Sequence, residues 1–257
     1  MADYDNRALQ GRAGPVTDVI DQGLRAYMLG VYNYMLVALV LTGLTAYGIA
    51  AATTTTDPAQ GLAALGHGLY LTSFGVTLYT SPLQWVVMLA PLAMVMFLSF
   101  RITHMSAATA QITFWVFSAL MGVSLSAIFL AYTSESIAQV FFITAAAFGG
   151  LSLWGYTTKS DLTGFGSFLI MGLWGLVIAS LVNLFLHSAM TAWVISIAGV
   201  GIFSGLTAYD TQKIKEMYYA NDDGTLVTQK SIMGALRLYL DFVNLFLSLL
   251  RLMGSRR

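Results

Sequence analysis

The chain has 257 residues, of which 57% are hydrophobic and only 9% are charged. Since a soluble domain carries roughly 25% charged residues, this composition excludes an ordinary water-soluble protein. Lys plus Arg and Asp plus Glu number 12 each, so no net charge attracts nucleic acid, and the absence of cysteine excludes disulfides, thiolate nucleophiles and cysteine metal sites.

Residues 1–28 form a polar tail without the short apolar core of a signal peptide, so we expect the first membrane helix to direct insertion. A helix needs about 20 mostly apolar residues to cross the hydrocarbon layer. The apolar runs of this chain are continuous rather than alternating, which favours helices over a β-barrel. The sequence therefore predicts an all-α membrane protein, with a seven-helix transmembrane domain at 29–253 and a basic tail at 254–257. The predicted spans are 29–52, 83–101, 107–131, 136–157, 165–187, 189–210 and 234–252.

The loops set the predicted orientation. Lys and Arg occur in the N-terminal tail and in the 2-3, 4-5 and 6-7 connections, but not in the 1-2 loop at 53–82 or in the 3-4 and 5-6 turns. The positive-inside rule then places the N-terminus in the cytoplasm and the 1-2 loop outside, where we expect a flexible loop. A seventh crossing places Arg251, Arg256 and Arg257 outside against the same rule, so a shallow or re-entrant seventh segment stays open.

Three ionisable residues fall within the predicted spans, where charges are costly and usually face the bundle interior. Arg101 ends the second span, Asp210 ends the sixth, and Asp241 lies seven residues into the seventh, roughly 10 Å deep. With the orientation above, all three fall in the cytoplasmic half of the membrane. Two close carboxylates in such a site tend to share one proton, and a guanidinium can hold a carboxylate bidentately. The sequence therefore predicts a pH sensor formed by Asp210 and Asp241, with Arg101 as its latch and a transient calcium site at the two carboxylates.

Simpler roles for these residues stay open. Arg101 can snorkel to the membrane interface, and Asp210 can begin a cytoplasmic extension of its helix. Asp241 can pair with an arginine four residues earlier on the same helix face, or hydrogen-bond near an asparagine that follows it. The candidate supporting residues are Tyr209, Arg237 and Asn244.

Several segments around these charges have a distinctive amino-acid sequence. They are FSALMGVSLSAIF in the third span, TAAAFGGLSLWGYTTKSDLTGFGSFL across the fourth and fifth, and GIFSGLTAYDTQKI in the sixth. With these passages, and with the order of Arg101, Asp210 and Asp241, the chain resembles the Bax inhibitor family over roughly residues 20–253. The YTTKSDL and YDTQ passages are specific for this family when they occur in the same chain.

The resemblance implies a seven-helix bundle with a central last helix and a leak of calcium that is governed by pH. It implies that the aspartates of helices 6 and 7, here Asp210 and Asp241, share a proton beside the helix 2 arginine, here Arg101. Calcium is then the permeant ion, and no cofactor is expected. The resemblance also implies a bacterial inner-membrane protein and an association with membrane protease machinery.

Two other functions stay open. The first is a non-transporting regulator that binds other membrane proteins, such as a membrane protease, through its helices or its 1-2 loop. The second is an intramembrane aspartyl protease, which also uses two aspartates on adjacent helices. Such proteases place glycines before the second aspartate, whereas Asp241 follows Leu238, Tyr239 and Leu240. We therefore expect a non-enzymatic protein whose partners are the lipid bilayer, protons and calcium ions, and not nucleic acid.

Overall fold

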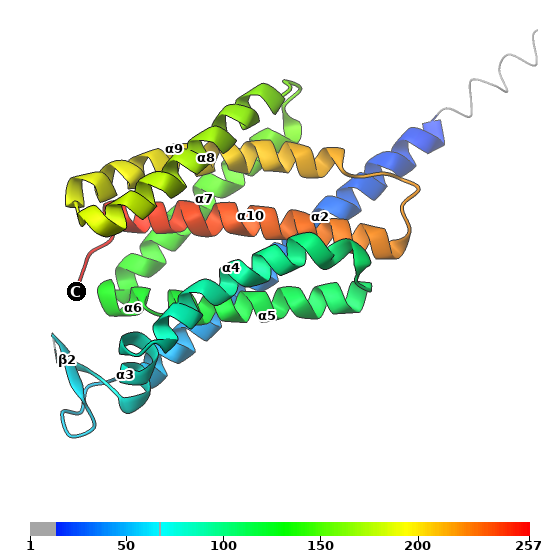
Figure 1. Ribbon diagram of the computed structural model, residues 1–257. Helices are drawn as coiled ribbons and strands as arrows, with labels where there is room; N and C mark the ends of the chain where they lie inside the picture. The colour runs from blue at the N-terminus through cyan, green and yellow to red at the C-terminus, as the bar shows by residue number, and fades with distance from the viewer. Residues whose placement is uncertain (1–13, 67) are drawn as a thin grey trace, which may run out of the picture.

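The computed structural model describes residues 14–66 and 68–257, and these form a bundle of long helices with a small sheet at one end (Figure 1). The first half of the predicted N-terminal tail lies outside the described residues. The helices are α2 (Gly14–Thr53), α3 (Ser73–Thr80), α4 (Leu83–Arg101), α5 (Ala107–Leu125), α6 (Ile128–Ala131), α7 (Ser134–Thr157), α8 (Thr163–Leu186), α9 (Ala189–Glu216) and α10 (Gly224–Met253), with a 3-10 turn at Ile102–His104.

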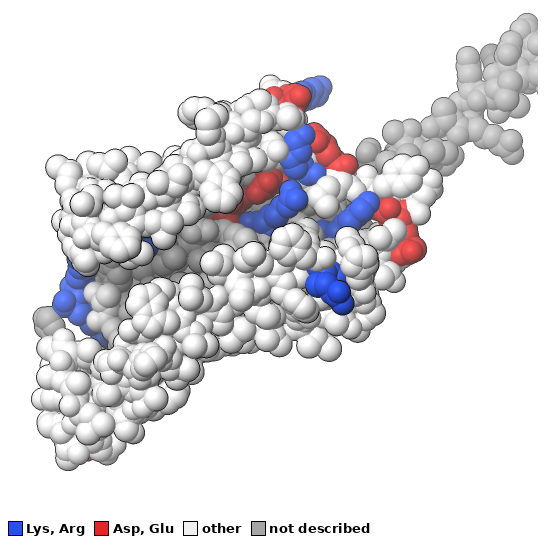
Figure 2. Space-filling view, viewed as in Figure 1, with Lys and Arg blue, Asp and Glu red and all other residues white. Residues whose placement is uncertain are grey.

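In the described part of the chain, seven segments are long and apolar enough to cross a membrane, and α5 with α6 makes one of them. Their outward faces are apolar: only 6% of the α8 span is buried, and Phe185 near its end is 85% exposed. Figure 2 shows a broad uncharged surface between the charged groups at the two ends of the bundle. An apolar surface of this extent needs lipid as its solvent. The chain is a multi-pass integral membrane protein, as its composition predicts.

Helix α10 is the centre of the bundle. It contacts α9, α2, α7 and α5, and Figure 1 shows it running between α8 and α9 on one side and α4 and α5 on the other. Of its apolar span 67% is buried, a larger share than in any other spanning helix described. The prediction of a central last helix is therefore confirmed.

Polar caps fix where the helices begin. At five helix starts, the side-chain oxygen of the residue before the first turn accepts a hydrogen bond from the backbone N–H three residues later. Each such cap stabilises its helix by about 1 kcal/mol. The capping residues are Thr72, Ser106, Thr133, Ser188 and Asp223.

Three helices are longer than the sequence predicts. Helix α2 already includes residues 14–28, which we expected to be a tail, α9 continues to Glu216 rather than ending at 210, and α10 begins at Gly224 rather than at 234. The extension of α10 carries polar residues, which a hydropathy window rejects, but it is held by tertiary contacts: Gln229 Nε2 donates a hydrogen bond to Met105 O at 2.6 Å. Because α10 is one continuous helix over 30 residues, it is not a re-entrant segment.

The connection between the first two spans is folded. Strands β1 (Thr54–Thr55), β3 (Leu69–Leu71) and β2 (Ala63–Gly66) form an antiparallel sheet in that order, and α3 follows. Helix α3 packs closely on the end of α2, since a Cβ at Gly75 would lie 2.3 Å from Thr53 O. The expectation of a flexible loop is wrong here, because strands of two to four residues are too short to show a period of two.

Candidate functional site

Asp210 and Asp241 meet at the interface between α9 and α10. Their carboxyl groups lie close enough to each other for a hydrogen bond to form when one of them is protonated. Asp241 is 5% exposed, near the middle of α10, and Asp210 is half-buried, roughly 9 Å before the end of α9. An ionised carboxylate only accepts hydrogen bonds, so a bond between two carboxyl groups needs one proton between them. The geometry is that of a proton-sharing pair.

One oxygen of this pair has no N–H or hydroxyl donor. Among the described residues, Asp241 Oδ2 is buried and accepts no hydrogen bond from any group other than the Asp210 carboxyl. A buried polar atom without a partner costs about 1–3 kcal/mol, so the site holds an acceptor that a proton or a cation would satisfy. The described residues contain no group of three or more His, Asp or Glu side chains suited to a metal ion. Two carboxylates alone fall short of the six to eight oxygen ligands of a resident calcium site.

Arg237 is the positive charge that acts on both carboxyls. It lies one helical turn before Asp241 on α10 and its side chain is exposed. It forms no salt bridge with either aspartate within the part of the chain described. Arg237 therefore influences the pair across a distance rather than by direct pairing.

Arg101 is positioned by the turn that follows it. This turn docks at Gln229, because Met105 O accepts a hydrogen bond from the Gln229 side chain. Gln229 precedes Asp241 by roughly 18 Å along α10, so the turn lies toward the start of α10 rather than beside the aspartate. The Arg101 side chain is exposed and forms no salt bridge among residues 14–66 and 68–257. The structure thus brings the two aspartates together and leaves Arg101 outside their hydrogen-bonding range.

The other two supporting candidates make contacts elsewhere. Tyr209 packs against α8, where a Cβ at Gly166 would lie 2.3 Å from its ring, and Lys213 Nζ lies 5.9 Å from the ring centroid. Asn244 Nδ2 donates to Leu240 O of its own helix at 2.8 Å. Both residues stabilise packing around the site, and in this structure neither is hydrogen-bonded to the aspartates.

A row of hydroxyl groups that sequence reasoning missed runs across the bundle beside the site. Tyr32 OH on α2 is hydrogen-bonded to Ser152 Oγ on α7 at 2.6 Å, and Ser152 Oγ to Thr211 Oγ1 on α9 at 2.9 Å. Thr211 directly follows Asp210, and its hydroxyl donates to Thr207 O at 2.7 Å. The sequence gives little indication of this row, because buried Ser and Thr are common in membrane helices, where their hydroxyls usually donate to backbone carbonyls of the same helix.

The YTTKSDL and YDTQ passages contact each other at the charged end of the bundle, which is the end where α7 joins α8 and α9 leads to α10. Gln212 Oε1 accepts from Leu162 N at 2.9 Å, and Gln212 Nε2 donates to Ser160 O at 2.8 Å. The connection is also capped by Asp161, whose carboxylate accepts from the Thr163 N–H and hydroxyl at 2.9 and 2.5 Å. These hydrogen bonds hold the pKa of Asp161 below its usual value. These contacts anchor α9 to the connection between α7 and α8 at Gln212, two residues after Asp210.

Comparison with known proteins shows similarity along almost the whole chain. A family described as "Inhibitor of apoptosis-promoting Bax1" matches residues 24–257. An uncharacterized protein of Rickettsia prowazekii is 47% identical over 237 residues, which cover 92% of each chain. The inner membrane protein YbhL of Escherichia coli is 43% identical over 249 residues, covering 95% of this chain and 98% of YbhL. A Caulobacter vibrioides protein is 44% identical over 239 residues, which cover 93% of this chain and 92% of the relative.

Proposed function

The chain belongs to the Bax inhibitor family of membrane proteins, and from this premise we propose that it is a pH-sensitive cation leak channel with calcium as the permeant ion. The observation that carries the proposal is the close approach of the carboxyl groups of Asp210 and Asp241, which lets them form a hydrogen bond while one of them is protonated. That bond exists only while the pair holds a proton. The protonation state of the pair therefore determines whether α9 and α10 are joined at this point.

Loss of the shared proton would place two negative charges side by side in a site that is largely shielded from water. Their repulsion is much stronger there than in water, because it scales inversely with the dielectric constant. Arg237 is exposed and offsets only part of it. Because α10 contacts α2, α5, α7 and α9, a shift of α10 against α9 would be transmitted to the whole bundle. In this proposal Arg101 acts as a latch only after such a shift brings it closer to the pair.

The same arrangement supports a channel rather than a protease. Leu238 and Tyr239, just before Asp241, are 0% exposed. A protease needs room beside its aspartates for an extended substrate strand, whereas Asp241 is 5% exposed and lies in a continuous, buried stretch of α10. We therefore assign the pair to titration and not to peptide hydrolysis.

We further propose that the charged end faces the cytoplasm of a bacterial cell. The Lys and Arg residues of the helix connections gather at that end, as the positive-inside rule requires. The printed name of the Escherichia coli relative places that protein in the inner membrane, and we extend this location to the present chain.

The test is calcium flux into proteoliposomes as a function of pH. Asp210→Asn and Asp241→Asn keep the size of each side chain but remove its titration, so each variant should lose the pH dependence of the wild-type flux. Asp161→Asn is the matched control, since Asp161 is exposed at the same end of the bundle and lies outside the pair. If Asp210→Asn and Asp241→Asn both keep the pH profile of the wild-type flux, the proposal is wrong.

A further inference from the structure

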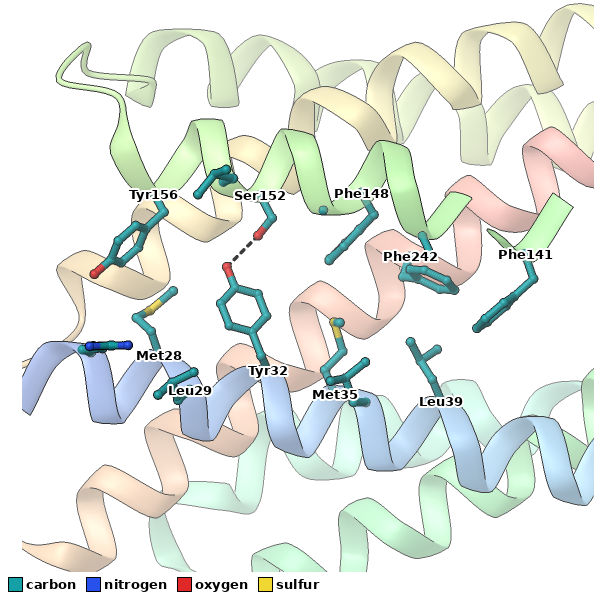
Figure 3. Close-up of a pocket in the computed structure, with 15 residues that line it drawn as sticks. Met28, Leu29, Tyr32, Met35, Leu39, Phe141, Phe148, Ser152, Tyr156 and Phe242 are labelled. Atoms are coloured by element: carbon teal, nitrogen blue, oxygen red, sulfur yellow. Dashed lines mark hydrogen bonds between the residues drawn. The ribbon is translucent and has the colours of Figure 1, made fainter. Parts of the chain in front are cut away.

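A groove runs along the side of the bundle between α2 and α7. Its volume is about 780 Å³, and its lining is almost entirely apolar, with Met28, Met35 and Leu39 from α2 and Phe148 from α7 among the lining residues. Figure 3 shows these side chains on the two walls, with Tyr32 reaching across from α2 to Ser152 on α7. Both helices are membrane-spanning segments, so the groove opens to lipid rather than to water.

The length and volume of the groove indicate what kind of molecule it can hold. Between Arg25 and Leu39, both of which line it, α2 rises by roughly 21 Å, which exceeds the roughly 15 Å depth of one leaflet. A volume of about 780 Å³ spread along that length makes the groove long and narrow. The groove is therefore long enough for an acyl chain, and the charge at one of its ends favours a lipid as the occupant.

One end of the groove is positively charged. Arg25 lines it at the charged end of the bundle and is exposed. At the same end Lys215 Nζ donates to Tyr156 O at 2.9 Å and lies 5.1 Å from the centroid of the Tyr156 ring, which also lines the groove. A cation at the membrane interface beside an apolar channel is complementary to a lipid with an anionic headgroup.

We propose that this groove binds one acyl chain of an anionic phospholipid, with the phosphate at Arg25 and the chain extending past Tyr32 toward Phe148. The site is separate from the Asp210–Asp241 pair, and the proposal does not depend on the channel function. Gly149 forms part of the open wall, since a Cβ there would meet nothing within 4 Å.

The experiment uses the full chain in vesicles that contain an anionic phosphatidylglycerol with a photoreactive group in its acyl chain. Mass spectrometry then locates the cross-linked residues. We expect cross-links on the groove faces of α2 and α7, and Gly149→Leu should reduce them about tenfold, the loss expected when roughly two methylenes leave an apolar site.

The matched control is Gly150→Leu, because Gly150 also has open space around its Cβ and does not line the groove. This variant should be labelled like the wild type. Arg25→Gln should reduce labelling by the anionic probe but not by a phosphatidylcholine probe with the same photoreactive chain, while Arg101→Gln should change neither.

Three results would overturn the proposal. They are even labelling of all lipid-facing helices, equal labelling of the Gly149→Leu and Gly150→Leu variants, and a cross-link through the groove to a second copy of the chain. The last result would make the groove an interface between protein copies.

Discussion

The hydrogen bonds around Tyr239 predict an unequal effect of two conservative substitutions. Tyr239 on α10 is 0% exposed, and its hydroxyl lies 2.8 Å from Thr42 Oγ1 on α2. Thr42 uses its only hydrogen in a bond to Ser118 O of α5 at 2.9 Å, so Tyr239 must be the donor to Thr42. The three residues therefore join α2, α5 and α10 in the centre of the membrane.

Thr42→Val removes the acceptor and leaves the Tyr239 hydroxyl buried without a partner, which should cost about 1–3 kcal/mol. Tyr239→Phe removes the donor but leaves Thr42 bonded to Ser118 O, so we expect a smaller loss of about 0.6–1 kcal/mol. The double variant has no orphaned hydroxyl and should be more stable than Thr42→Val alone.

Equilibrium unfolding in mixed detergent micelles measures these free energies. The three variants and the wild type form a double-mutant cycle, which isolates the interaction of the two hydroxyls. If the two single losses simply add in the double variant, or if Tyr239→Phe is the more damaging change, the assignment of donor and acceptor is wrong.

Three further predictions concern the packing and the charged end. Gly155→Val should sharply lower the yield of folded protein, because even a Cβ at this position would lie 2.3 Å from an α9 backbone oxygen. In the same expression and melting assay, Gly150→Ala should be neutral or should stabilise α7 by up to about 1 kcal/mol, because the space around Gly150 is open. Gln212→Ala should lose both hydrogen bonds to the connection between α7 and α8, so amide hydrogen exchange at 158–162 should become faster while the core of α10 stays protected. The pKa of Asp161, measured by NMR, should lie below the usual value of about 3.9 and should rise in Thr163→Val. Because the pKa is lowered in the folded protein, Asp161 contributes to stability at pH values above its pKa in the unfolded chain. This contribution is lost as the pH falls through its pKa in the folded protein.

The seven spans and the aspartate pair could be predicted because both follow from simple physical costs. Lipid requires long apolar helices, and a charge inside such a helix must face the bundle interior. Asp210 and Asp241 were therefore conspicuous in the sequence, and counting helices placed them in the same half of the membrane. Their close approach at the interface between α9 and α10 fits that expectation.

Features that depend on tertiary contacts could not be predicted. The polar first turns of α10 form a helix because Gln229 finds an acceptor at Met105 O, which no hydropathy window can register. Arg101 forms no ion pair with either aspartate because its position depends on where the turn after α4 docks on α10, at Gln229. The hydroxyls of Tyr32, Ser152 and Thr211 meet across three helices, and their spacing in the sequence gives no sign of it.

The proposed gating requires that pH acts through a proton shared by Asp210 and Asp241. Infrared difference spectra of the protein in proteoliposomes can follow the carbonyl band of a protonated carboxyl group while calcium flux is measured on the same sample. The account predicts a band that disappears as the pH rises, that is missing or displaced in Asp210→Asn and Asp241→Asn, and whose midpoint coincides with that of the flux. A flux that changes with pH while this band stays constant would contradict it.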